Sequence, residues 1–194
     1  MKKAFALLIL LATYFVGYAQ KSSIAPNIRK FKGDTIVWKQ DSLLNKDDFK
    51  AKGHGKNGPL GYTTTCIFLY PNESNGALVF SVEALFIKSK SYIVEYSDYV
   101  LKHEQLHFDI CELYARKLRK MISDKDFKKV SNVMQAIQNM YNKASQDCFK
   151  EEEKYDNDTN HGLNAAKQQV WADDIKKQLT ELDAYSNTEV NTVK

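Results

Sequence analysis

The first half of the chain alternates short hydrophobic segments with turn-forming residues. Residues 62–70 are rich in threonine, aromatic and β-branched residues, and hydrophobic residues alternate along 77–86. Both segments are predicted to be strands. Residues 71–76 contain a proline, two asparagines and a glycine, which favours a hairpin connection between them. Residues 36–38 and 91–96 are shorter strand candidates.

The second half of the chain has a helical period. Over residues 99–121, one predicted helix face carries a mostly apolar stripe: His103, His107, Ile110, Tyr114, Leu118 and Met121. The opposite face carries Gln105, Asp109, Glu112, Arg116 and Lys120, which we expect at the surface or beside a functional site. Glu104 lies on the apolar flank, where an unpaired carboxylate would be costly.

Two further helices are expected. Ser123-Asp124 is a favourable helix start, and apolar residues then recur at helical spacing: Phe127, Val130, Met134, Ile137, Tyr141, Ala144 and Cys148. This helix is predicted to break at residues 156–160. The last helix has Trp171, Ile175, Leu179 and Leu182 on one side. Strands followed by helices predict an α+β fold with a small N-terminal antiparallel or mixed sheet and two long C-terminal helices.

The N-terminus resembles an export signal. Two lysines precede an apolar run over residues 4–16, and residues 17–19 form a small-x-small cleavage site. We therefore expect a flexible lead-in at 20–33, a single domain at 34–186 and a frayed tail at 187–194. The apolar run is shorter than a spanning helix and no cysteine follows the cleavage site, so no stable membrane anchor is expected after cleavage. The protein would be exported, to the periplasm or the medium.

Charge and cysteine content limit the possible partners. The formal net charge of the chain is +4, and it falls to +2 without the two signal lysines, which argues against nucleic-acid binding. Cys66, Cys111 and Cys148 would reach an oxidising compartment, so one disulfide is expected. A Cys111–Cys148 pair would join two helices, although the sequence does not determine the pairing. A cysteine as zinc ligand is the less favoured alternative, because thiolate sites are mostly structural.

Residues 103–107 form the motif His-Glu-x-x-His. On a helix, His103 and His107 point the same way and can share one metal ion, with Glu104 placed to act on a metal-bound water. The alternative is a purely structural role, in which His103, Glu104 and His107 are hydrogen-bonded core residues. The motif predicts one Zn²⁺ per chain and hydrolysis of peptide bonds with Glu104 as general base.

A catalytic zinc site needs a third protein ligand. His161 is the best candidate, because it lies at the expected break between two helices. Asp156, Asp158 and His54 are the alternatives, and His161 could also be an ordinary polar residue near a helix start. Tyr155 is the candidate donor to the developing negative charge of the tetrahedral intermediate, although a core position is equally compatible with its place in the chain.

The motif helix resembles a bacterial secreted family catalogued as domain of unknown function number 922. The resemblance rests on residues 103–118 and on the Tyr-Asp-x-x-Thr-x-His-Gly run at 155–162, and it extends to Trp38, Asp48, Phe49, Phe86, Ser91, Gln168 and Trp171. The family is described as zinc-dependent proteases. The resemblance implies a zincin-like arrangement, with a small sheet packed on the motif helix, and it favours His161 over His54. Leu106 departs from the expected small residue, which would narrow the space beside the metal.

Three functions follow from these patterns. The first is an exported zinc metallopeptidase that acts on a peptide or protein substrate. The second is a zinc-binding envelope protein without turnover, which would have no use for Glu104 at an open coordination position. The third is a helical module that binds a partner through its second-half helices and holds no metal.

Overall fold

Strand β4 (Ala77–Ile87) is the centre of the main sheet in the computed structural model, which describes residues 33–53, 59–74 and 77–192. It pairs along its length with β3 (Thr65–Ser74) on one edge. On the other edge it pairs with β1 (Thr35–Val37) and, further along, with β6 (Glu189–Asn191). All these pairs are antiparallel. A second, two-stranded sheet joins β2 (Gly61–Tyr62) to β5 (Tyr92–Ile93).

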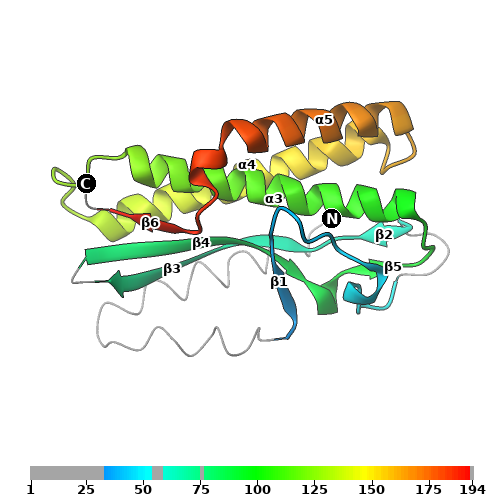
Figure 1. Ribbon diagram of the computed structural model, residues 1–194, viewed down its shortest axis with the longest axis horizontal. Helices are drawn as coiled ribbons and strands as arrows, with labels where there is room; N and C mark the ends of the chain where they lie inside the picture. Colours follow the sequence, from blue (N-terminus) through cyan, green and yellow to red (C-terminus); the bar gives the residue numbers. More distant parts are fainter. Residues whose placement is uncertain (1–32, 54–58, 75–76, 193–194) are drawn as a thin grey trace. The chain divides into compact units, whose positions relative to one another are not determined.

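Three helices pack together on one side of this sheet (Figure 1). They are α3 (Asp98–Asp124), α4 (Val133–Thr159) and α5 (Ala165–Glu181). Helices α3 and α4 lie against the sheet, and the third, α5, lies on the other two helices. Short 3-10 turns occupy Lys46–Asp48, Lys88–Lys90 and Asp183–Tyr185. The fold is therefore α+β with small antiparallel sheets, as predicted. None of the helices in the described ranges is both long and apolar enough to span a membrane.

The core lies between the main sheet and α3. Alternate residues of β4, from Phe80 to Phe86, join one buried cluster with Phe108, Ile110 and Leu113 of α3. The rings of Phe86 and Phe108 lie 5.9 Å apart. This alternation is the pattern expected of a strand with one face on the core. It fixes α3, which carries the His-Glu-x-x-His motif, against the sheet.

Helix α3 also contacts α4 and α5, so it is enclosed on several sides. The predicted polar stripe is consequently not a surface stripe: Gln105, Glu112 and Arg116 are buried. Glu112 accepts hydrogen bonds from Arg116 at 3.0 Å and from Arg119 at 2.9 and 3.1 Å. Arg119 also donates to the Val82 carbonyl at 3.0 Å. These buried charges are tolerated because each has a partner.

Several predicted boundaries differ from the structure. Strand β3 continues through Pro71 to Ser74, so the hairpin connection is shorter than expected; proline is tolerated because β3 is an edge strand. The residues at 187–194 do not simply fray, because β6 forms there and buries Val190 against the core cluster. The expected signal at 1–19, residues 20–32 of the expected lead-in and His54 lie outside the described residues.

The helix predicted from Ser123-Asp124 begins later. Helix α3 runs through Asp124, and α4 starts only after Asn132, whose side chain accepts a hydrogen bond from the Gln135 amide. Phe127 and Val130 therefore lie in the connection, although Phe127 is still buried. The break expected at 156–160 begins only at its last residue, because α4 continues through Thr159 and Asn160 then has a left-handed φ of 51°.

The expected disulfide is absent from the structure. Cys66, Cys111 and Cys148 are free thiols. A hydrogen bond with Cys111, together with burial, holds the pKa of Cys148 well above its ordinary value. The two cysteines that were considered as a pair thus lie together in the core in reduced form.

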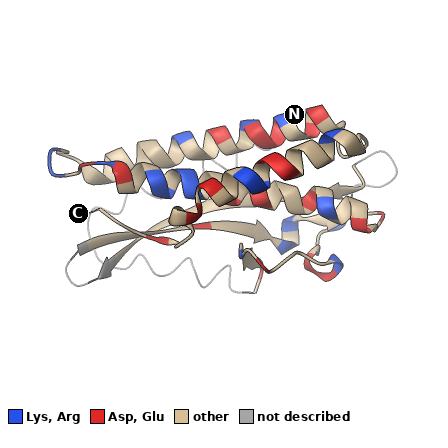
Figure 2. Cartoon of the chain, turned by 45° about the horizontal axis from the view of Figure 1, so that its top comes forward, with Lys and Arg blue, Asp and Glu red and all other residues tan. Residues whose placement is uncertain are grey.

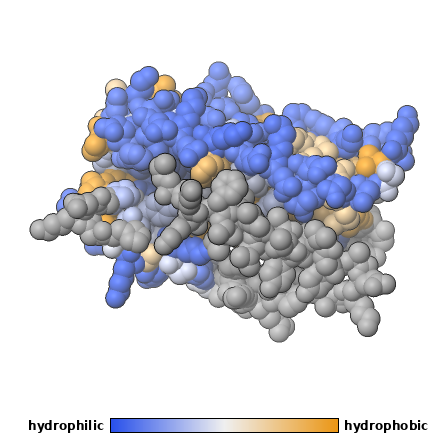
Figure 3. Space-filling model, turned by 180° about the vertical axis from the view of Figure 1, so that it is seen from behind, coloured by the Kyte–Doolittle hydropathy of each residue, from blue (hydrophilic) through white to orange (hydrophobic). Residues whose placement is uncertain are grey.

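Charged residues of both signs are interspersed along the helices (Figure 2). Some form pairs one turn apart, such as Lys143 with Asp147 at 2.8 Å. On the face shown in Figure 3, the hydrophobic areas among the described residues are small and separated by hydrophilic ones.

Candidate metal centre

The first turns of α3 carry the two motif histidines. Ser97 begins the helix by accepting a hydrogen bond from the Val100 amide at 3.1 Å. His103 and His107 follow one turn apart, with ring centroids at 5.0 Å, and both are buried. A helical spacing of four residues places them on one face, as the motif predicts.

Asp156 of α4 faces both histidines. Its Oδ1 lies 3.2 Å from His103 Nε2 and 3.1 Å from His107 Nε2. The ligand atoms of these three residues all lie within 4.8 Å of one another, which would allow them to hold a metal ion. The two histidines hold the pKa of Asp156 well below its ordinary value, despite its partial burial. Asp156 is therefore an anionic partner for the motif.

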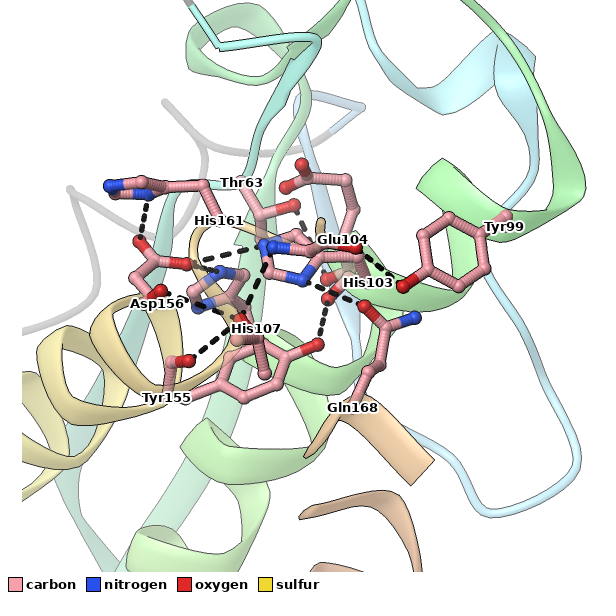
Figure 4. A network of polar contacts seen from close by, with 11 residues as sticks. Thr63, Tyr99, His103, Glu104, His107, Tyr155, Asp156, His161 and Gln168 are labelled. Atoms are coloured by element: carbon pink, nitrogen blue, oxygen red, sulfur yellow. Dashed lines mark hydrogen bonds and ion pairs between the residues drawn. The ribbon is translucent and has the colours of Figure 1, made fainter. Parts of the chain in front are cut away.

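His161, the preferred third ligand from the sequence, is placed differently. Its side chain is 63% exposed, and its Nδ1 lies 3.5 Å from Asp156 Oδ2, on the far side of the carboxylate from the motif (Figure 4). Helix α4 extends through Thr159, so Asp156 still projects from a helix, whereas His161 follows in a left-handed conformation. The alternative Asp158 accepts a hydrogen bond from Trp171 Nε1 at 3.2 Å.

Glu104 is 2% exposed, and its Oε2 has no hydrogen-bond partner among the described residues. Burial raises the pKa of its carboxyl, although His107, His103 and Thr63 oppose this shift. Gly61 of β2 lies directly beside it: a Cβ built on Gly61 would come within 2.3 Å of Glu104 Oε1. The glycine therefore provides the space that the glutamate occupies, and β2 closes one side of the site.

Tyr155 packs against both motif histidines. It is fully buried, and its ring stacks on His103 at 4.7 Å and meets the edge of His107 at 5.0 Å. Its hydroxyl points to the backbone carbonyl of His103 at 3.5 Å. Helix α4 packs Tyr155 beneath the two imidazoles, where it supports them, and the oxyanion role expected from the sequence stays a prediction.

Residues 84–162 match the family model described as "bacterial protein of unknown function (DUF922)". We refer to this stretch, which is similar to that family, as the DUF922 segment. The match confirms the resemblance noted from the motif helix. No curated protein and no solved structure matches the chain. The DUF922 segment contains the motif, Asp156 and His161, and its description names no activity, so any function must be argued from the site.

Sequence reasoning assigned no role in the site to three further residues. Gln168 of α5 lies after the DUF922 segment, with Oε1 at 3.2 Å from His103 Nδ1. Thr63, before it, donates a hydrogen bond to the Glu104 carbonyl at 3.3 Å. Tyr99 donates to the Gly162 carbonyl and so joins the start of α3 to the turn after α4. Gln168 belonged to the family resemblance, but its contact depends on how α5 packs.

Glu152 lies one turn before Asp156 in the DUF922 segment, and its carboxyl has a raised pKa that can be tested by measuring stability against pH. Burial raises the pKa of its carboxyl from 4.5 to about 7, although His107 and the hydrogen bond from Thr65 oppose this. A raised carboxyl pKa means that the folded state binds the proton more tightly than the unfolded state. Its contribution to stability is therefore present below pH 4.5 and is lost as the pH rises through 7.

We expect Glu152→Gln to reduce this loss of folding stability at high pH in the metal-free protein. The neutral amide should leave stability at pH 5 nearly unchanged and raise it at pH 8 by up to about 3 kcal/mol, since one pKa unit corresponds to about 1.4 kcal/mol. Urea unfolding of EDTA-treated protein at both pH values measures this. Glu153→Gln, at an exposed neighbouring position, is the control. Parallel pH dependence of the parent and Glu152→Gln would contradict the assignment.

Proposed function

We propose that the protein is an exported zinc-dependent peptidase in which His103, His107 and Asp156 hold zinc and Glu104 is the general base. The observation that carries the proposal is the buried Glu104 Oε2 without a partner, next to three converging ligand atoms. A buried carboxylate oxygen without a partner is costly unless a ligand or water satisfies it. A structural site would have no need of such a group.

The donor set fits zinc. Two imidazole nitrogens and one carboxylate oxygen are common zinc ligands, and three protein ligands leave a position for water or substrate. When bound, zinc would supply Lewis-acid chemistry by activating water and polarising the substrate carbonyl. The packing of α3 on an antiparallel sheet, with a further ligand from α4, supports a zincin-like arrangement.

The chain's own groups account for the proton transfers. Glu104 would accept the proton of the attacking water and pass it to the nitrogen of the leaving amine. Tyr155 would hold the two imidazoles in place by stacking. His161, exposed beside Asp156, replaces Tyr155 as the candidate donor to the substrate's developing oxyanion. The reaction then needs no covalent intermediate.

The proposal is tested first by metal content and cleavage. The protein from Gln20, stripped with EDTA and reloaded, should hold one zinc per chain by elemental mass spectrometry. It should cleave members of a diverse peptide library, with EDTA abolishing cleavage and zinc restoring it. The variant with both His103→Ala and His107→Ala is the control.

Two outcomes would point elsewhere. A reloaded parent without zinc would contradict both zinc-dependent functions and leave the helical partner-binding module. Zinc at one per chain, without cleavage of any peptide, would favour the zinc-binding protein without turnover.

A further inference from the structure

The two ring nitrogens of His103 have different partners. Nε2 lies 3.2 Å from Asp156 Oδ1, within the proposed metal site. Nδ1 lies 3.2 Å from Gln168 Oε1. An amide oxygen only accepts hydrogen bonds, so Nδ1 must carry the proton in this contact. A proton on Nδ1 leaves the lone pair of Nε2 free to bind a metal.

Gln168 is built to make this contact. The residue is 6% exposed, as is His103, so water does not substitute easily for the Gln168 side chain. It lies in the first turn of α5, which Asn164 begins by accepting a hydrogen bond from the Lys167 amide at 3.1 Å. The backbone N–H of Gln168 also donates a hydrogen bond to the Asn164 carbonyl at 2.9 Å. The start of α5 therefore holds Gln168 in register with His103.

The turn between α4 and α5 leaves room for the contact. Gly162 has a φ of +81°, which favours glycine. A Cβ there would lie 3.1 Å from His103 Nδ1 and 3.4 Å from Gln168 Oε1. The Gly162 amide donates to Thr159 Oγ1 at 3.2 Å, and its carbonyl accepts from Tyr99. Hydrogen bonds on both sides of Gly162 thus hold the turn in place beside His103 and Gln168.

We propose that Gln168 is a positioning residue that sets the tautomer and the ring orientation of His103 for zinc binding. This rests on the proposed function, and it makes α5 part of the site although α5 lies outside the DUF922 segment. Partners that orient a ligand histidine typically contribute about 10- to 100-fold to metal affinity. Loss of the acceptor at Gln168 should have an effect of this size.

The test compares two substitutions in the mature chain. Gln168→Met removes the acceptor at similar size and should weaken zinc binding by about 10- to 100-fold, measured by competition with a chromophoric chelator. Gln168→Glu keeps an acceptor and should bind zinc at least as tightly as the parent. Gln105→Met is the control, because buried Gln105 binds the Leu44 amide and Asp109 instead of His103. Its zinc affinity should stay within about threefold of the parent's.

A second measurement uses the parent protein and therefore does not require that any variant folds. Nitrogen-15 NMR of the zinc-loaded parent should show a protonated Nδ1 on His103. An unprotonated Nδ1, or a Gln168→Met variant that binds zinc as tightly as the parent, would overturn the proposal. Equal weakening by Gln168→Glu and Gln168→Met would overturn it too. A parent that binds no zinc would instead overturn the proposed function.

Discussion

Glu104→Gln should lower kcat for peptide hydrolysis by about 10²- to 10⁴-fold, the usual contribution of a positioned general base, while zinc stays bound. Glutamine keeps the size of the side chain but cannot accept the water's proton. Glu104 is not among the three residues whose ligand atoms converge, so its loss should spare metal binding. Paired measurements of kcat and of zinc per chain separate the two effects.

The matched control for this substitution is Glu83→Gln. Glu83 lies on β4 and is partly buried, and burial raises the pKa of its carboxyl as it does for Glu104. Its substitution should leave kcat within about threefold of the parent's, as for a distant and independent site. Retained activity in Glu104→Gln would remove the general base from the proposal. Loss of zinc together with activity would make Glu104 a ligand.

The motif pair was predictable because its geometry is local. A spacing of four residues on a helix places His103 and His107 together whatever the rest of the chain does. The amphipathic pattern of α3 was a weaker guide, since it assumes one buried face. Contacts with the sheet, α4 and α5 bury Glu112 and Arg116 as well. Such a pattern cannot tell a paired internal charge from a solvated one.

The third ligand depends on distant packing. Whether Asp156 or His161 approaches the motif is decided by where α4 ends, and the left-handed Asn160 places that end four residues after Asp156.

Strand β6 was not predicted, because it also depends on contacts between distant parts of the chain. Three residues give little periodicity, and Val190 becomes ordered by pairing opposite Phe80 of β4. Gln168 likewise acquires its contact with His103 only when α5 packs against α3.

Asp156→Ala should abolish stoichiometric zinc binding, whereas His161→Ala should retain it. Asp156 places one oxygen between the two Nε2 atoms of the motif, and its removal leaves two protein ligands, fewer than a catalytic zinc site requires. We expect zinc affinity to fall by roughly 10³-fold or more, because a direct ligand should count for more than an orienting partner. His161→Ala should instead lower kcat by about 10- to 100-fold, if its exposed imidazole stabilises the oxyanion.

Asp158→Ala is the control for this pair of variants, because Asp158 lies in the same turn of α4 but bonds Trp171. It should bind zinc as the parent does, with some loss of thermal stability. Zinc titration and peptide cleavage on all three proteins decide between the ligand sets. Zinc lost from His161→Ala and kept by Asp156→Ala would restore His161 as the third ligand, and would mean that the turn at Asn160 rearranges when the metal binds. Zinc lost from both would indicate that the two residues act together, with His161 orienting Asp156 through its Oδ2.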